Sequence, residues 1–359
     1  AALIASHAAT ATAATLNISN GTLGTAALNV NGTSLATINI TSTGASNVVG
    51  QLTTDSAVIT GITIDATTAL STGGIVITNS NASAAESLTV SGAAASVGAT
   101  TTAAERSAVV LGTLDTDIAS LDASGLTAGG VSATLAGATQ TFVGGAGSDT
   151  LTTGVDNHTG AIDAGAGTDT LVLGATAHIS IAAEGALYKG FEVLSANAQD
   201  LDMDLMTGST ITAVAIGATG SAITDMTATQ AGAVTFAGGV GTTTLGIKNA
   251  GNVGTIDTLT ITVSDGDTTA SEAVMATGVL TIAGVETINV TATDDLVVTD
   301  LSGVTGMTAL TVSGAGNADV ITTAQALGAN TNINYSALTG SNVYNAAAAT
   351  TNAFAFTGG

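Results

Sequence analysis

The sequence predicts an all-β fold, a right-handed parallel β-solenoid in which short strands stack in successive turns. Three observations support this prediction. Short segments with alternating apolar residues recur every ten to twelve residues, as at 16–18, 28–30 and 38–40, which is typical of repetitive β proteins. A segment containing glycine and aspartate recurs after twenty residues. The composition suits a narrow interior far better than a wide core.

The composition is unusual for a globular protein of 359 residues. Charged residues make up 8% and aromatic residues 2%, and there is no Cys, Trp or Pro. Without bulky side chains a wide core cannot be filled, whereas Ala, Thr, Gly and Val fit between closely stacked strands. No apolar run reaches 18 residues, so we expect no membrane insertion.

The charge balance is strongly acidic. The sequence contains 26 acidic residues and only three Lys or Arg residues, Arg106, Lys189 and Lys248, which gives a net charge of −23. Nucleic acid is excluded as a partner, since phosphate binding needs clustered Lys and Arg. Self-repulsion of this size opposes compaction unless counter-ions bind. The sequence therefore predicts calcium dependence and an extracellular setting, where this ion is plentiful.

Two glycine-rich segments carry the metal prediction. Residues 144–151 read GGAGSDTL and residues 165–171 read GAGTDTL, which matches the nine-residue pattern GGxGxDxUx of calcium-binding parallel β-rolls. Glycine allows positive φ, so carbonyl oxygens can turn toward an ion, and Asp adds a carboxylate oxygen. The predicted Ca²⁺ ligands are Gly145, Gly147, Asp149, Gly165, Gly167 and Asp169, with Asp163 as a supplementary ligand.

The spacing of the two segments bears on whether they stack. Asp149 and Asp169 are 20 residues apart, whereas two nine-residue halves would separate them by 18. We therefore expect stacked turns with a two-residue bulge between them.

Two further acidic groups are candidate ligands. Asp200, Asp202 and Asp204 alternate with apolar residues, so one continuous strand would place the three carboxylates on one face. Repulsion on that face favours a cation there, and a solvated outer strand is an equally good interpretation. Asp319 follows a glycine turn that has one residue too many.

Catalysis has little support in the sequence. His7, His158 and His178 are the only histidines, and no Ser-His-Asp, Cys-His or zinc-ligand spacing is visible. His158 lies in a polar turn, which predicts an exposed side chain. We therefore expect a protein that is not an enzyme.

The chain resembles the repeat-in-toxin (RTX) proteins, and among them the calcium-dependent surface-layer (S-layer) proteins of the Caulobacter type. Besides the two glycine-rich segments, the resemblance includes GFEVL at 190–194 and AGVETINV at 283–290. It implies type I secretion and self-assembly with Ca²⁺ into a lattice on the cell surface. It also implies attachment to lipopolysaccharide through a region outside this chain.

The expected organisation is a β-solenoid over 1–140, calcium-binding β-roll turns over 141–175, and a β-solenoid over 176–359 that continues beyond the chain end. The expected function is structural, as part of a secreted, self-assembling bacterial surface layer. Alternatives are a stalk segment of a large RTX adhesin and an extracellular matrix fibre. A secreted β-helix carbohydrate-active enzyme is less favoured, because such enzymes need clustered His, Lys, Arg and Tyr.

Overall fold

The structure, a computed structural model, is an all-β protein whose parallel sheets form a β-solenoid of about 13 turns, with little helix. It describes residues 2–78, 85–96, 107–238, 240–252, 254–264, 273–275, 279–298, 300–322, 331–346 and 355–358. The predicted fold class is therefore confirmed. The chain divides into two compact units, residues 1–192 with 208–210, and residues 193–207 with 211–359; the predicted boundaries at 140 and 175 stay predictions.

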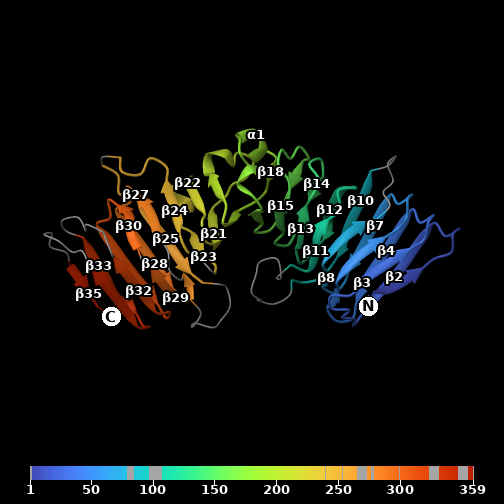
Figure 1. Cartoon of the computed structure of the whole chain (residues 1–359), viewed down its shortest axis with the longest axis horizontal. Coiled ribbons are helices and arrows are strands. Elements are labelled where there is room, and N and C mark those ends of the chain that lie inside the picture. Colours follow the sequence, from blue (N-terminus) through green and yellow to red (C-terminus); the bar gives the residue numbers. More distant parts are fainter. Residues whose placement is uncertain are drawn as a thin grey trace. The chain divides into compact units, whose positions relative to one another are not determined.

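Unit 1 is built from two parallel sheets (Figure 1). The first sheet contains β1 (Leu3–Ser6), β3 (Ala27–Asn31), β5 (Asn47–Val49), β6 (Gln51–Thr54), β8 (Leu70–Thr72), β9 (Gly74–Ile77), β11 (Val109–Leu114), β13 (Val131–Leu135), β15 (Thr150–Thr153) and β17 (Thr170–Leu173). The second sheet contains β2 (Ala13–Ser19), β4 (Thr37–Thr43), β7 (Gly61–Ala66), β10 (Glu86–Gly92), β12 (Ile118–Leu126), β14 (Thr141–Val143), β16 (Ile162–Asp163) and β18 (Tyr188–Lys189).

Unit 2 is built from three sets of parallel strands. One set contains β19 (Val193–Asn197), β21 (Ala213–Ala218), β23 (Val234–Phe236), β25 (Thr258–Val263), β28 (Thr287–Ala292), β31 (Ala309–Gly314), β33 (Asn332–Leu338) and β35 (Ala355–Thr357). The second contains β20 (Asp200–Asp202), β22 (Ala222–Met226), β24 (Thr243–Ile247), β27 (Val279–Ala283) and β30 (Asp300–Thr305). The third contains β26 (Ala273–Met275), β29 (Asp295–Val298), β32 (Ala318–Thr322) and β34 (Asn342–Ala346).

Alternation along each strand fixes the register between turns. In β4, Ile38 and Ile40 are 0% and 3% exposed, while Asn39 between them is partly exposed. The register places Ile38 beside Ile62 and Ile40 beside Ile64 of β7. A slip of one residue would turn every one of these isoleucines toward solvent, so the apolar pattern specifies this register.

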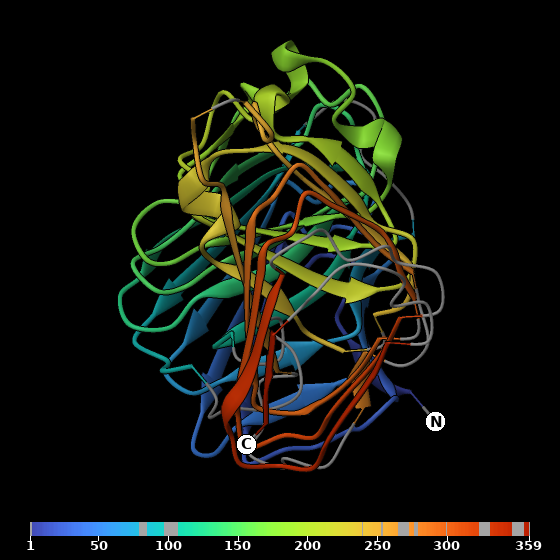
Figure 2. The ribbon, with the colours of Figure 1, turned by 90° about the vertical axis from the view of Figure 1, so that its left-hand side faces the viewer.

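Short helical segments interrupt the strands: η2 (Thr176–His178), α1 (Ala182–Gly185), η3 (Met203–Leu205) and α2 (Ala228–Ala231). The segment that carries η2 and α1 extends beyond the strands of unit 1 (Figure 2). A capping box begins α2, because Gln230 Oε1 accepts the Thr227 N–H at 2.7 Å and Thr227 Oγ1 accepts the Gln230 N–H at 3.4 Å. Among the described residues, none of the helices has the length and hydrophobicity needed to cross a membrane.

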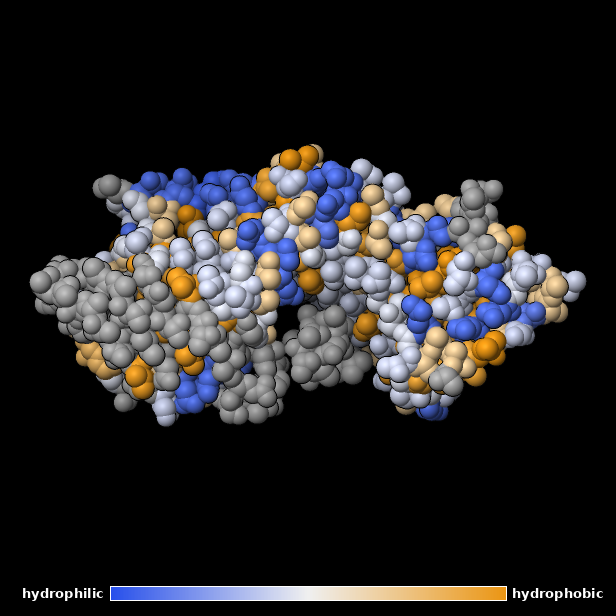
Figure 3. Space-filling model, viewed as in Figure 1, coloured by the Kyte–Doolittle hydropathy of each residue, from blue (hydrophilic) through white to orange (hydrophobic). Residues whose placement is uncertain are grey.

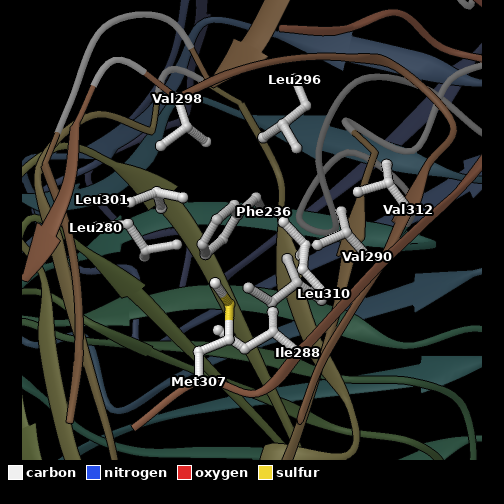
Figure 4. Close-up of a pocket in the computed structure, with 11 residues that line it drawn as sticks. Phe236, Leu280, Ile288, Val290, Leu296, Val298, Leu301, Met307, Leu310 and Val312 are labelled. Carbon is white, nitrogen blue, oxygen red and sulfur yellow. The ribbon is translucent and has the colours of Figure 1, made fainter. Parts of the chain in front are cut away.

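The interior of unit 2 contains a small cavity. It has a volume of about 30 Å³ and lies among apolar side chains (Figure 4). Val290 and Leu310 on its wall are 6% and 5% exposed. The cavity is lined by Phe236, Ile261, Leu280, Ile288, Val290, Leu296, Val298, Leu301, Met307, Leu310 and Val312. Because no polar side chain lines it, we expect it to stay dry.

Candidate functional site

The two glycine-rich segments stack on each other in unit 1. β15 and β17, which follow the segments, pair in parallel with Thr150 beside Thr170 and Leu151 beside Leu171. Both leucines are fully buried, at 0% exposure. The 20-residue separation therefore brings equivalent positions of the two segments into adjacent turns, as the sequence predicts.

The glycines of these segments are required for two different reasons. Gly165 and Gly167 have positive φ, +86° and +149°, as expected for turns that aim carbonyl groups inward. Gly145 and Gly147 are not among the residues with positive φ, which corrects the expectation for this pair. At Gly147 a Cβ would lie 2.3 Å from the Gly129 carbonyl carbon, so close approach of the preceding turn excludes any side chain.

Asp149 is fully buried and its carboxylate accepts two backbone hydrogen bonds. Oδ1 accepts the Val131 N–H at 2.6 Å, and Oδ2 accepts the Gly145 N–H at 2.8 Å. The side chain is 0% exposed. Both oxygens are thus held by amides, one from the preceding turn and one from its own glycine-rich segment.

Asp169 repeats this role one turn further along. Its Oδ1 accepts the Asp149 N–H at 2.7 Å, and its own N–H donates to Glu192 Oε2 at 2.8 Å. We call Asp149, Asp169 and Glu192 the acid ladder, because each carboxylate accepts an amide N–H from the turn before it. Asp169 Oδ2 is buried and has no hydrogen-bond partner. One ladder oxygen is therefore left for a ligand.

Glu192 is a site residue that the sequence analysis did not assign. It belongs to the GFEVL segment, and its equivalent in the AGVETINV segment has the same role in unit 2. There, Glu286 Oε2 accepts the Asp257 N–H at 2.8 Å. The shared Gly-(Phe/Val)-Glu sequence was the available signal, and the structure shows that its glutamate links consecutive turns.

Burial dominates the electrostatics of the ladder. It raises the pKa of Asp149 to about 6, although the Val131 and Gly145 amides act in the opposite direction. Burial likewise raises the pKa of Asp169 to about 7, and the charges of Asp149 and Glu192 add to the increase. Two carboxylates are thus held in a water-poor site, where a nearby cation would favour their charged forms.

The donor set suits a hard cation such as Ca²⁺, which prefers oxygen ligands. A Cβ placed on Gly167 would lie 2.5 Å from the Gly147 carbonyl oxygen, so this carbonyl of the preceding turn lies close to the segment that carries Asp169. Within the described residues, no group of three or more His, Cys, Asp or Glu side chains is arranged to hold a metal. An ion here would therefore depend on backbone carbonyl oxygens as well as carboxylates.

Asp163, the predicted supplementary ligand, lies on the outer surface of β16. Its Oδ1 accepts the Gly165 N–H at 3.1 Å. In the parallel pairing of β16 with β18, Asp163 lies beside Lys189. Asp163 therefore supports the start of the second glycine-rich segment from the solvent side.

The prediction of one strand through Asp200, Asp202 and Asp204 is wrong. β20 ends at Asp202, whose carboxylate accepts the Asp204 N–H at 2.9 Å and starts the 3-10 turn η3. Asp204 then forms an ion pair with Lys248 at 2.6 Å, and this hydrogen bond raises the pKa of Lys248. Asp200 Oδ1 accepts the Ala222 N–H at 2.8 Å. A lysine and two backbone amides thus contact the three carboxylates.

Asp319 belongs to β32, where it lies between Val297 of β29 and Val343 of β34. Its side chain lies outside the described part of the structure, so its assignment as a ligand stays a prediction.

The histidines differ from expectation. His158 is buried, at 3% exposure, and not exposed as its polar turn predicts. Its ring lies 6.1 Å from that of Tyr188, a contact made by the following turn that no local pattern reveals.

His178 Nδ1 lies 2.7 Å from Thr153 Oγ1, and its Nε2 lies 3.4 Å from Asp156 Oδ1. This hydroxyl–imidazole–carboxylate series was not predicted. Thr153 Oγ1 also accepts the Gly174 N–H at 2.8 Å and is 3% exposed, so the series links turns inside the solenoid.

The fold and the ladder define a parallel β-solenoid with buried acids that link its turns. No known protein family, curated protein or solved structure matches the chain.

Proposed function

We propose that this chain is a structural protein of a secreted bacterial surface layer, which assembles with itself in the presence of Ca²⁺ and has no enzymatic activity. The observation that carries the proposal is the stacking of Asp149 and Asp169 in adjacent turns, with a buried Asp169 oxygen that has no hydrogen-bond partner. The net charge of −23 supports it, since bound cations would reduce self-repulsion.

Asp149 and Asp169 would hold the ion together with carbonyl oxygens of the glycine-rich segments. Bound Ca²⁺ would supply positive charge beside two buried carboxylates. The chain itself positions the oxygens: Val131 and Gly145 orient the Asp149 carboxylate, and the Asp149 N–H orients that of Asp169. Calcium would thereby strengthen the contact between adjacent turns.

Under this proposal the protein leaves the cell by type I secretion and lies on the cell surface. Copies of the chain are its main partners, and lipopolysaccharide is contacted through a region outside this chain. Neither nucleic acid nor membrane insertion takes part.

Electron microscopy of the purified chain tests the proposal. We expect ordered sheets with millimolar Ca²⁺, loss of the sheets with excess EDTA, and recovery when Ca²⁺ is restored. The variant Asp149→Ala/Asp169→Ala should bind fewer calcium ions and fail to assemble, whereas Asp65→Asn, which removes an exposed charge from β7, should assemble normally. Sheets that persist in EDTA would reject calcium-dependent assembly. A calcium-bound chain that stays monomeric would favour the adhesin stalk instead.

A further inference from the structure

A surface pocket of unit 1 lies beside the helical segment that interrupts the solenoid. It has a volume of about 330 Å³ and lies between the loop at 157–159 and residues 181–187. The surface of the segment carrying α1 includes a group of apolar atoms at its tip (Figure 3). This pocket is separate from the acid ladder, and nothing in the proposed surface-layer function uses it.

A buried imidazole forms one wall of the pocket. His158 is 3% exposed, and its Nε2 is buried without a hydrogen-bond partner. Burial lowers the pKa of His158, so the ring is neutral near pH 7. Backbone groups of Gln140, Gly160 and Gly137 beside the ring act in the opposite direction. A neutral imidazole carries one N–H and keeps one nitrogen lone pair, which a ligand with N–H donors can use.

A carboxylate forms another wall. Glu184 is 7% exposed, and its Oε2 accepts hydrogen bonds from Ser180 N at 2.7 Å, Ser180 Oγ at 3.0 Å and Ile181 N at 3.1 Å. The hydrogen bond from the Ser180 amide is the main cause of a lowered pKa at Glu184, so the carboxylate is ionised. Because these three bonds all go to Oε2, Oε1 is left as an acceptor for a ligand.

The remaining walls are mainly apolar and carry no positive charge. Ile181, which is 55% exposed, lines the pocket with Ala183 and Leu187. Asn157 and Thr159 complete the lining, and no Lys or Arg takes part. An ionised carboxylate and an imidazole lone pair lie beside these apolar side chains. The combination favours a ligand with N–H donors, one positive charge and an apolar body. A metal ion is a poorer fit, since the described residues offer only these two ligating side chains here.

We propose that this pocket binds a primary alkylammonium group, with the ammonium between Glu184 and His158 and the alkyl chain against Ile181 and Leu187. The same chemistry is offered by a free alkylamine and by a lysine side chain of another protein. Both forms of the ligand present three N–H donors on a single cationic nitrogen.

The intact chain can be titrated with n-butylammonium by NMR, following the His158 ring protons, and by calorimetry. We expect saturable binding to one site, weakened at least tenfold by Glu184→Gln, which keeps an oxygen for the Ser180 and Ile181 amides. Asp65→Asn removes the same charge from an exposed position on β7 and should leave the affinity unchanged. Equal weakening by both variants would show general charge attraction and overturn the proposal, as would a wild-type chain without saturable binding.

The length of the alkyl chain on the ligand supplies a second test, which does not depend on the folding of Glu184→Gln. From ethylammonium to butylammonium, affinity of the wild-type chain should rise on the order of fourfold per methylene, and Ile181→Ser at the rim should reduce that gain. Affinity independent of chain length would contradict the apolar wall. A titration with Nα-acetyl-lysine methylamide separates the two ligand sources: binding as tight as that of butylammonium indicates a lysine side chain, and weaker binding a free amine.

Discussion

Asp169 Oδ1 accepts the backbone N–H of Asp149, from the preceding turn of the solenoid, at 2.7 Å. The hydrogen bond joins two residues that occupy the same position in their glycine-rich segments, so a metal-ligand candidate is also a structural link between turns. The two roles use different oxygens, because Oδ2 of Asp169 has no hydrogen-bond partner. Substitutions can therefore separate them.

Asp169→Asn keeps an oxygen for the Asp149 N–H and removes the charge, whereas Asp169→Ala removes the acceptor as well. In metal-free buffer we expect Asp169→Ala to lower the free energy of unfolding by about 1–3 kcal/mol, the cost of a buried amide without a partner, and Asp169→Asn to change it far less. With Ca²⁺, both variants should lose the stabilisation that the wild type gains. Urea unfolding with and without Ca²⁺ measures this; an Asn variant that gains as much as the wild type would show that Asp169 is no ligand.

The stability of the metal-free chain should depend on pH in a defined direction. Burial raises the folded-state pKa of Asp149 to about 6 and of Asp169 to about 7, above their unfolded values near 3.8. The folded state therefore binds more protons between these values. With respect to these groups, its stability should be highest below about pH 4, fall as pH rises from 4 to 7 and level off above. The loss is on the order of 3 kcal/mol for Asp149 and 4 kcal/mol for Asp169.

Calcium should reverse that trend, since carboxylates must lose their protons to bind it. The stabilisation by Ca²⁺ should grow from pH 5 to pH 8. Thermal unfolding across this range checks both statements, with Asp149→Asn/Asp169→Asn as the variant expected to lose most of the pH dependence. A wild-type curve that rises with pH without metal would contradict the buried position of the two acids.

Glu286 provides a test of the turn-linking role in unit 2. Its Oε2 accepts the Asp257 N–H at 2.8 Å. We expect Glu286→Ala to lower the free energy of unfolding by about 1–2 kcal/mol, because the part-buried Asp257 amide loses its acceptor, while Glu286→Gln retains an oxygen there and should cost little. Equal costs for the two variants would mean that the charge, and not the hydrogen bond, matters. Denaturant unfolding monitored by circular dichroism measures both.

Close approach between turns predicts where a methyl group cannot be added. A Cβ on Gly73 would lie 1.8 Å from the Gly50 carbonyl oxygen, whereas a Cβ on Gly21 would have no neighbour nearer than 3.7 Å. Gly73→Ala should therefore displace the backbone and cost at least about 2 kcal/mol, in the range for overpacked sites. Gly21→Ala should be neutral or stabilise by up to about 1 kcal/mol. Paired thermal melts test this, and a Gly73→Ala chain as stable as Gly21→Ala would disprove the close contact.

Because of the cavity in unit 2, we expect an added methylene to have opposite effects on the free energy of unfolding in the two units. Val290 lines the cavity, so Val290→Ile should raise the free energy of unfolding by up to about 1 kcal/mol. Val90 is 0% exposed in the interior of unit 1 and does not line this cavity, so Val90→Ile should destabilise by about 1–3 kcal/mol. Urea unfolding compares the pair, and destabilisation by both would mean that the space beside Val290 cannot accept a methyl group.

The fold could be predicted because its main determinants are local. Alternating residues such as Ile38 and Ile40 mark strands, and the repeat of Asp149 at Asp169 marks the turn length. The contact partner of each side chain was harder to predict from the sequence, because the partner belongs to an adjacent turn some 20 residues away. Hence Glu192 was recognised as part of a motif without its role, and His158 was expected in solvent although the ring of Tyr188 contacts it.

The error at Asp204 has a different origin. The alternation of acids and apolar residues from 200 to 205 is a good strand pattern, but Asp202 caps a 3-10 turn with its own carboxylate. Side-chain hydrogen bonds of this kind compete with strand pairing. The pattern alone gives no means of deciding between the two outcomes.

The cavity among Phe236, Val290 and Leu310 also gives unit 2 an internal void. Hydrostatic pressure favours states that eliminate such voids, and the volume decrease on unfolding scales with the void volume. Under rising pressure the NMR signals of unit 2 should disappear before those of unit 1, so compression can separate the unfolding of the two units.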